Sequence, residues 1–174
     1  MSDTMSAMGR IALLHGYLLD GSGSNLWTQN VSRSLACDFG HEVHLICQEP
    51  HPEKYLGGIK GLHFHKPDLG GTLPVYVMDR YEGYERVVPV IELSDSEIEN
   101  YIKLNVKAIT AIVEKNQVEH IFSNHVVLIS VAAQWVSEKT GIPDAVIPHG
   151  GASENADRKE DRMKRTETSA STEP

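Results

Sequence analysis

Short apolar runs alternate with amphipathic patterns along the chain. The runs with the length and composition of buried strands cover residues 11–14, 43–47, 74–78, 120–123 and 145–148. Between the first two runs, Trp27, Val31 and Leu35 recur at four-residue steps, which is the spacing of one helix face. This pattern predicts a helix that begins near Leu26 and ends before Gly40.

Two further helices are predicted in the second half of the chain. Ser94 and Glu97 have the spacing of a capping box, in which each side chain bonds the backbone of the other residue. The stripe that follows at helical steps consists of Ile98, Ile102, Asn105, Ile109 and Ile112. Another helix, after residue 125, is predicted to run to about Thr140, because Gly141 and Pro143 then stop it.

The alternation of strands and helices predicts the fold class. It indicates an α/β domain with a mainly parallel sheet covered on both faces, in a doubly wound, Rossmann-like arrangement over residues 10–152. Residues 49–73, rich in glycine, proline and histidine, are predicted to form a loop. Residues 1–9 and the polar segment 153–174 are expected to be disordered, because neither carries enough apolar side chains to bury.

Composition narrows the functional classes. The chain has 174 residues and a formal net charge of −8, which disfavours binding to nucleic acid or to an anionic membrane. No apolar run approaches the ~20 residues of a membrane span, and the N-terminus lacks the pattern of a signal peptide. Cys37 and Cys47 are expected to be small core residues in a reducing compartment. We therefore expect a soluble, cytoplasmic protein.

Candidate binding residues follow several strands, where open parallel sheets bind their ligands. They are the loop Gly21, Ser22 and Gly23, the acid Glu49, the pair Asn124 and His125, and the turn His149 and Gly150. Glycines before a helix let backbone N–H groups approach a phosphate, although a tight turn would need them equally. An imidazole at a strand end could serve as an acid, a base or a hydrogen-bond partner of a sugar, or could merely cap the next helix.

Two alternatives concern a nicotinamide cofactor and a metal. Glu49 could hold ribose hydroxyls in a dinucleotide site, but Leu26 stands where the third glycine of that fingerprint is expected. His63 and His65 have the spacing of metal ligands on an extended segment. No cysteine or further histidine is close to them in the sequence, so we expect a polar loop and no metal.

Three stretches together resemble a known family. They are GRIALLHGYLLDGSGSNLWTQNVSRSLACDFGHEVHLICQ, LPVYVMDRYEGYE and VEHIFSNHVVLISVAAQWVSEKTGIPDAVIPHGGAS. Their order and spacing resemble the N-terminal half of the retaining glycosyltransferases of the GT-B fold, family 4, which are grouped with glycogen synthase and bacterial mannosyltransferases. The resemblance covers about residues 10–152.

The resemblance implies a function. Members transfer a hexose from a nucleotide sugar, the donor substrate, to a carbohydrate acceptor, and most need no metal or other cofactor. By this resemblance His125 is a catalytic residue that contacts the transferred sugar, Gly21 and Gly23 meet the donor phosphates, and His149 and Gly150 line the cleft. Ser22 lies between the two glycines and Asn124 precedes His125, so we expect both to contact the substrate as well.

The resemblance has no counterpart for the family's donor-binding C-terminal domain. We therefore expect little or no transfer by this chain alone, and a separate C-terminal half as a partner. The alternatives are a non-catalytic module that binds a sugar, a nucleotide or a protein partner, and a nicotinamide-dependent oxidoreductase.

Overall fold

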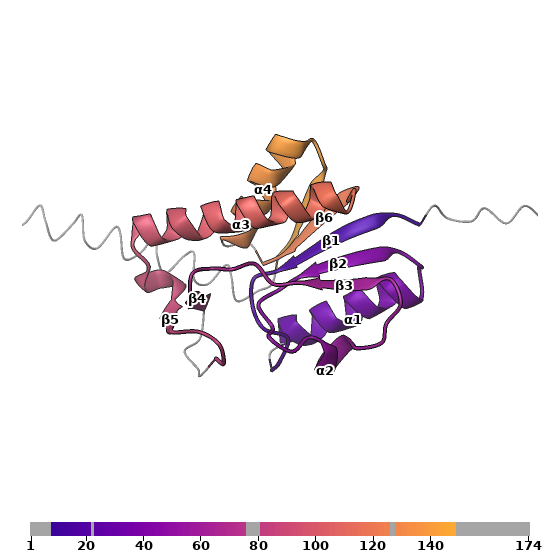
Figure 1. Ribbon diagram of the computed structural model, residues 1–174, viewed down its shortest axis with the longest axis horizontal. Helices are drawn as coiled ribbons and strands as arrows, with labels where there is room; N and C mark the ends of the chain where they lie inside the picture. Colours follow the sequence, from indigo (N-terminus) through magenta and orange to yellow (C-terminus); the bar gives the residue numbers. More distant parts are fainter. Residues whose placement is uncertain (1–7, 22, 76–80, 126–127, 149–174) are drawn as a thin grey trace, which may run out of the picture.

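The computed structural model describes residues 8–21, 23–75, 81–125 and 128–148 (Figure 1). Its main sheet has five strands in the order β3-β2-β1-β6-β7, and every neighbouring pair is parallel. The strands are β1 (Arg10–His15), β2 (Glu42–Ile46), β3 (Leu62–His65), β6 (His120–Asn124) and β7 (Asp144–Ile147). This is a Rossmann-like α/β fold, as the sequence predicts.

Helices cover both faces of the sheet. They are α1 (Gly23–Cys37), α2 (Glu53–Leu56), α3 (Asp95–Lys115) and α4 (Ile129–Thr140), with a 3₁₀ turn, η1, at Val90–Glu92. In Figure 1, α1 and α2 lie on one side of the strands and α3 and α4 on the other. Neighbouring residues of β1 therefore pack on opposite sides, with Leu13 in the core under α1 and Leu14 in the core under α3 and α4.

The predicted strand at 74–78 is not part of the main sheet. It corresponds to β4 (Thr72–Val75), which pairs only with β5 (Arg86–Pro89) in a separate two-stranded parallel sheet. Pro74 has no N–H group for a ladder on both sides, which suits a short outlying strand. Residues 76–80 lie outside the described residues.

The remaining strand of the main sheet, β3, lies inside the segment predicted as a loop. His63 and His65 alternate there with Leu62 and Phe64. The strand was missed because histidines occupy one of its two faces, so the segment carries a weak hydrophobic signal.

Helix α1 also differs from its prediction. It begins at Gly23, and its buried face consists of Asn25, Thr28, Ser32 and Ala36. Trp27, Val31 and Leu35 are only partly buried at the edge of the core. The small and polar face lies inward because Asn25 and Thr28 form hydrogen bonds with His15 at the end of β1.

The two other helices match their predictions. The Ser94 hydroxyl accepts from the Glu97 N–H and the Glu97 carboxylate accepts from the Ser94 N–H, which is the expected capping box. Ile102, Asn105 and Ile109 of the stripe are buried. Helix α4 ends at Gly141, whose φ of +75° is a left-handed cap.

The cysteines differ from one another. Cys47 is buried, and burial raises the pKa of its thiol to about 12, so the thiol stays protonated. Cys37 is exposed at the end of α1, so the expectation of a core residue is wrong there. Helices of the length and apolarity needed to cross a bilayer are absent from the described part of the chain.

Candidate functional site

The C-terminal ends of β1 and β6 form a buried polar centre with the start of α1. Asn124, the last residue of β6, is fully buried beside His15, the last residue of β1. Its amide Nδ2 lies 3.1 Å from His15 Nδ1 and donates to the Thr28 hydroxyl of α1 at 2.6 Å. The amide therefore joins two neighbouring strands to the helix that follows the glycine loop.

The hydrogen bonds assign the tautomer of His15. Its Nε2 atom lies 3.0 Å from both the Leu18 carbonyl and Asn25 Oδ1, which are acceptors. Nε2 must therefore carry the proton, and Nδ1 accepts from Asn124. A neutral imidazole satisfies this arrangement, so His15 acts as a fixed connector between the strand ends and α1.

The glycine loop is fastened from the same centre. Asn25 Nδ2 donates to the Asp20 carbonyl, and the Thr28 hydroxyl donates to the Ser24 carbonyl at 2.9 Å. Gly21 has φ +90°, which favours glycine, and a Cβ at Gly21 or Gly23 would have no atom within 4 Å. The loop is thus held in place while the space beside these two glycines stays open.

His125 follows this centre directly and has a strained backbone. Its φ is +95°, a region that non-glycine residues rarely adopt, and its N–H donates to the Ile147 carbonyl of β7 at 3.1 Å. Its ring packs edge-on against Tyr17 at 5.2 Å and lies 5.6 Å from the ring of His15. With 7% of its surface exposed, the imidazole is largely enclosed at the sheet edge. Such strain often occurs at functional sites.

Glu49 acts as a tether for the same loop. One carboxylate oxygen accepts from the Leu19 N–H at 3.1 Å and the other from the His51 N–H at 3.0 Å, and the residue is 5% exposed. The Gln29 side chain donates to the Leu19 carbonyl at 2.7 Å. Both oxygens bond backbone groups and the carboxylate is buried, which favours a structural role for Glu49 over a contact with ribose.

The structure brings together most of the predicted candidates that it describes. Asn124 lies against the start of α1, since its Nδ2 also reaches the Ser24 carbonyl at 3.5 Å, and His125 follows it beside His15 and Tyr17. Ser22, His149 and Gly150 lie outside the described residues. Among the described residues, no group of three or more histidine, cysteine, aspartate or glutamate side chains could hold a metal ion.

Sequence reasoning missed His15, Tyr17 and Thr28. His15 ends a predicted strand, so the rule that selected Asn124 could also have selected it. Tyr17 and Thr28 gave no such signal, because their roles depend on the way the loop folds back over the sheet edge.

Comparisons with known proteins show distant structural likeness. The sequence matches no protein-family model and no curated protein. A glycosyltransferase from Rickettsia africae is 13% identical with a TM-score of 0.51, over 81% of this chain and 30% of that chain. The C-terminal domain of a hydrogenase from Pyrococcus furiosus is 12% identical with a TM-score of 0.47, over 83% of this chain and 95% of that domain.

A UDP-galactose 4-epimerase gives a TM-score of 0.40 at 10% identity, over 80% of this chain and 55% of that chain. At these identities the likenesses show the fold alone. This chain spans less than a third of the glycosyltransferase it resembles.

Proposed function

We propose that the chain is the N-terminal, acceptor-side part of a retaining, nucleotide-sugar-dependent hexosyltransferase of the family 4 type. The observation that carries the proposal is the position of His125. Its imidazole is held at the C-terminal sheet edge on a strained backbone, beside a centre that fixes the glycine loop and the start of α1. The distant likeness to a glycosyltransferase is consistent with it.

In this reaction the bond between the anomeric carbon and the donor diphosphate breaks. An acceptor hydroxyl oxygen bonds that carbon on the same face, the hydroxyl proton passes to the departing phosphate oxygen, and the nucleoside diphosphate leaves. The open space beside Gly21 and Gly23, at the N-terminal end of α1, suits the negative charge of the leaving diphosphate. His125 would hydrogen-bond the transferred sugar, and Asn124 would hold His15 and α1 in position around it.

The proposal includes a second protein part. Charge stabilisation in a transition state requires groups placed around the reacting atoms, and this site offers one wall. We infer that a donor-binding half, encoded separately or as a further domain, supplies the other wall. The chain alone should then bind nucleotide sugars weakly and form little or no product.

Nuclear magnetic resonance can test this ligand site. The ¹⁵N-labelled chain is titrated with UDP-, GDP- and ADP-glucose, and amide shifts are followed. We expect perturbations at Tyr17, Gly23 and His125 with at least one donor. Asparagine tolerates a positive φ but lacks the imidazole, so His125→Asn should reduce these perturbations. His120→Asn, at the opposite end of β6, is the matched control. Unchanged spectra, or equal binding by His125→Asn, would refute the proposal.

A second candidate is a non-catalytic module that binds a protein partner. Its support comes from β7, where Ala145 and Val146 are exposed although parallel strands are usually buried on both faces. Val146 keeps 42% of its surface exposed. Sedimentation and binding of an apolar dye, compared between the natural chain and Val146→Lys, test this candidate. A clean monomer without dye binding would contradict it.

A further inference from the structure

Three histidines come together on the α3 side of the sheet. His44 of β2 is paired in register with His63 of β3, and their rings stack with centroids 4.9 Å apart at 18°. His44 Nδ1 lies 3.0 Å from Nε2 of His65, also on β3. His44 is 1% exposed, whereas the His63 side chain is half exposed. The cluster thus spans the pairing between β2 and the edge strand.

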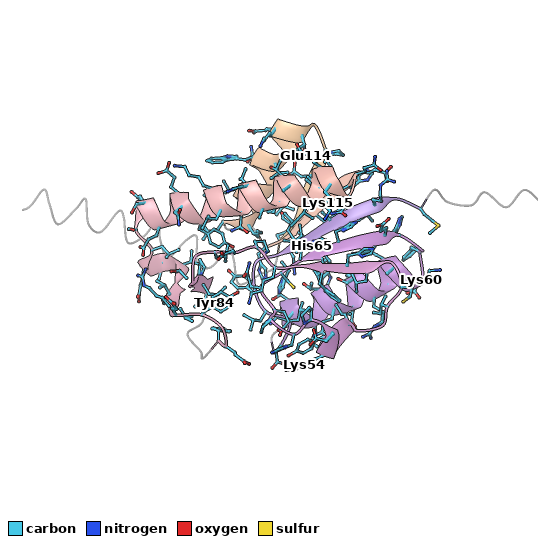
Figure 2. The ribbon with its side chains drawn as sticks, viewed as in Figure 1. Lys54, Lys60, His65, Tyr84, Glu114 and Lys115 are labelled. Atoms are coloured by element: carbon cyan, nitrogen blue, oxygen red, sulfur yellow. The ribbon has the colours of Figure 1, made fainter. Side chains whose placement is uncertain are left out.

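The charges around the cluster are unbalanced. Glu42 of β2 places Oε1 3.5 Å from His44 Nε2 and 3.3 Å from His63 Nε2. Lys115, at the C-terminal end of α3, lies near His65 (Figure 2), and its positive charge disfavours protonation of His65.

The neighbouring strand adds a further cation. Arg10 of β1 stands in register beside Glu42 and forms an ion pair with Glu119 at 3.5 Å. In the described part of the chain, Glu42 is the one carboxylate that pairs with the cluster, whereas Lys115 places positive charge beside His65.

The contact between His44 and His65 requires that they not both be charged. A hydrogen bond between two imidazole nitrogens needs one donor and one acceptor, and two imidazolium rings offer only donors. Burial, followed by the charge of His63, lowers the pKa of His44. Burial, followed by the charges of His44, His63 and Lys115, lowers the pKa of His65 to about 4.

We propose that His44, His63 and His65 form an acid-sensitive latch that holds β3 on the sheet at neutral pH and releases it when the cluster takes up protons. The strand is suited to this role because it has only four residues and lies at the edge of the sheet. Two backbone bonds mark its pairing, from the Val43 N–H to the Gly61 carbonyl at 2.7 Å and from the Cys47 N–H to the His65 carbonyl at 3.0 Å. The proposal is independent of the transferase hypothesis.

The direction of the pH effect follows from linkage. Free imidazole has a pKa of about 6.5, and the closed form lowers the pKa of His44 and that of His65. The open form therefore binds more protons at these two residues. The closed form is therefore fully favoured above about pH 6.5, and this preference is lost as the pH falls toward 4. One proton taken up on opening multiplies the opening equilibrium by about ten for each pH unit.

Hydrogen exchange at single amides measures this opening. The full chain is exchanged at pH 7, 6 and 5, and each rate is divided by the intrinsic rate at that pH. Between pH 6 and 5, the protection of the Val43 and Cys47 amides should fall about tenfold. The Ile121 amide, which bonds the Pro143 carbonyl between β6 and the start of β7, should keep its protection. Equal slopes at Val43 and Ile121 would overturn the proposal.

Substitutions separate the cluster from general acid sensitivity. His65→Gln removes one titrating ring but keeps a polar side chain, so the pH slope at Val43 should become flatter even if its protection at pH 7 is lower. His120→Gln, at an exposed histidine of β6, is the matched control and should retain the natural slope. An unchanged slope in His65→Gln would exclude the latch.

Discussion

Asn124→Ala tests the centre on which the candidate site is built. The amide of Asn124 joins β6 to His15 at 3.1 Å and to Thr28 at 2.6 Å, and all three side chains are fully buried. Alanine fits the strand but can donate no side-chain hydrogen bond. The substitution therefore removes the connection while leaving the backbone of β6 in place.

The cost can be worked out from the hydrogen bonds. After the substitution, His15 Nδ1 loses its donor, and leaving this buried acceptor unsatisfied costs about 1–3 kcal/mol. The Thr28 hydroxyl, 3.3 Å away, could turn toward that nitrogen instead, but it would give up its own bond to the Ser24 carbonyl at 2.9 Å, which costs about 1 kcal/mol. The space left by the amide adds about 1 kcal/mol. We expect the free energy of unfolding to fall by about 2–4 kcal/mol.

Urea unfolding at pH 7, followed by circular dichroism, measures this loss. Asn30→Ala is the control, because Asn30 is exposed on α1 and alanine there should change stability by only a few tenths of a kcal/mol. The slope of the unfolding free energy against urea should be unchanged, so that the midpoint reports stability. A loss for Asn124→Ala no larger than that for Asn30→Ala would refute the network.

Asn124→Asp tests the same hydrogen-bond network through the pH dependence of its stability defect. A carboxylate at this position can only accept, so His15 must carry protons on both nitrogens to keep its bonds. The variant should raise the folded-state pKa of His15 above its unfolded value. The stability that results is fully present below about pH 6.5 and is lost as the pH rises through the raised pKa. The defect of Asn124→Asp should therefore be smaller at pH 6 than at pH 8.5, and a pH-independent defect would contradict the assigned tautomer.

Three further predictions concern α3. Ser94→Ala removes the capping box and should lower the free energy of unfolding by about 1 kcal/mol in thermal melts. The hydrogen bond from Arg86 and those from Ser94 hold the pKa of Glu97 at about 2, so Arg86→Gln should raise this pKa. A carboxyl ¹³C titration measures the pKa of Glu97, and an unchanged value would contradict the Arg86 contact. Ile109→Ala, at a fully buried position, should cost about 2–5 kcal/mol in urea and Ile98→Ala clearly less, and equal costs would contradict the assigned core face.

The elements that the sequence predicts well have local causes. The start of α3 depends on Ser94 and Glu97, three residues apart, and the end of α4 on Gly141. Strand β1 carries a continuous apolar run, residues 11–14, because both of its faces are buried. Each of these signals lies within a few residues of the feature that it determines.

The elements that the sequence misses depend on contacts that are distant along the chain. Strand β3 is polar on one face because its histidines meet His44, about twenty residues earlier in the chain. The inner face of α1 is polar because Asn25 and Thr28 bond His15 of the preceding strand. In both places a buried hydrogen-bond network replaces apolar packing, so hydrophobic periodicity predicts the wrong face or no element.

At the candidate site, the sequence predicts the position of the residues better than their roles. The rule that ligands bind at the carboxyl ends of parallel strands selected Asn124 and His125 together. The structure gives them different environments, since Asn124 is enclosed by His15 and Thr28 whereas His125 continues past the strand on a strained backbone. A strand-end position therefore indicates where a site lies but not which side chain faces a ligand.

The strain at His125 bears on how a ligand would bind. A positive φ at a non-glycine residue costs of order 1–3 kcal/mol and persists only where the surroundings hold it. Here the surroundings are the bond to the Ile147 carbonyl and the packing against Tyr17 and His15. Folding therefore meets this cost before any ligand arrives, and the imidazole position is set in advance. A ligand that uses His125 would find the side chain already oriented, so its binding should leave the backbone of residues 124 and 125 in place.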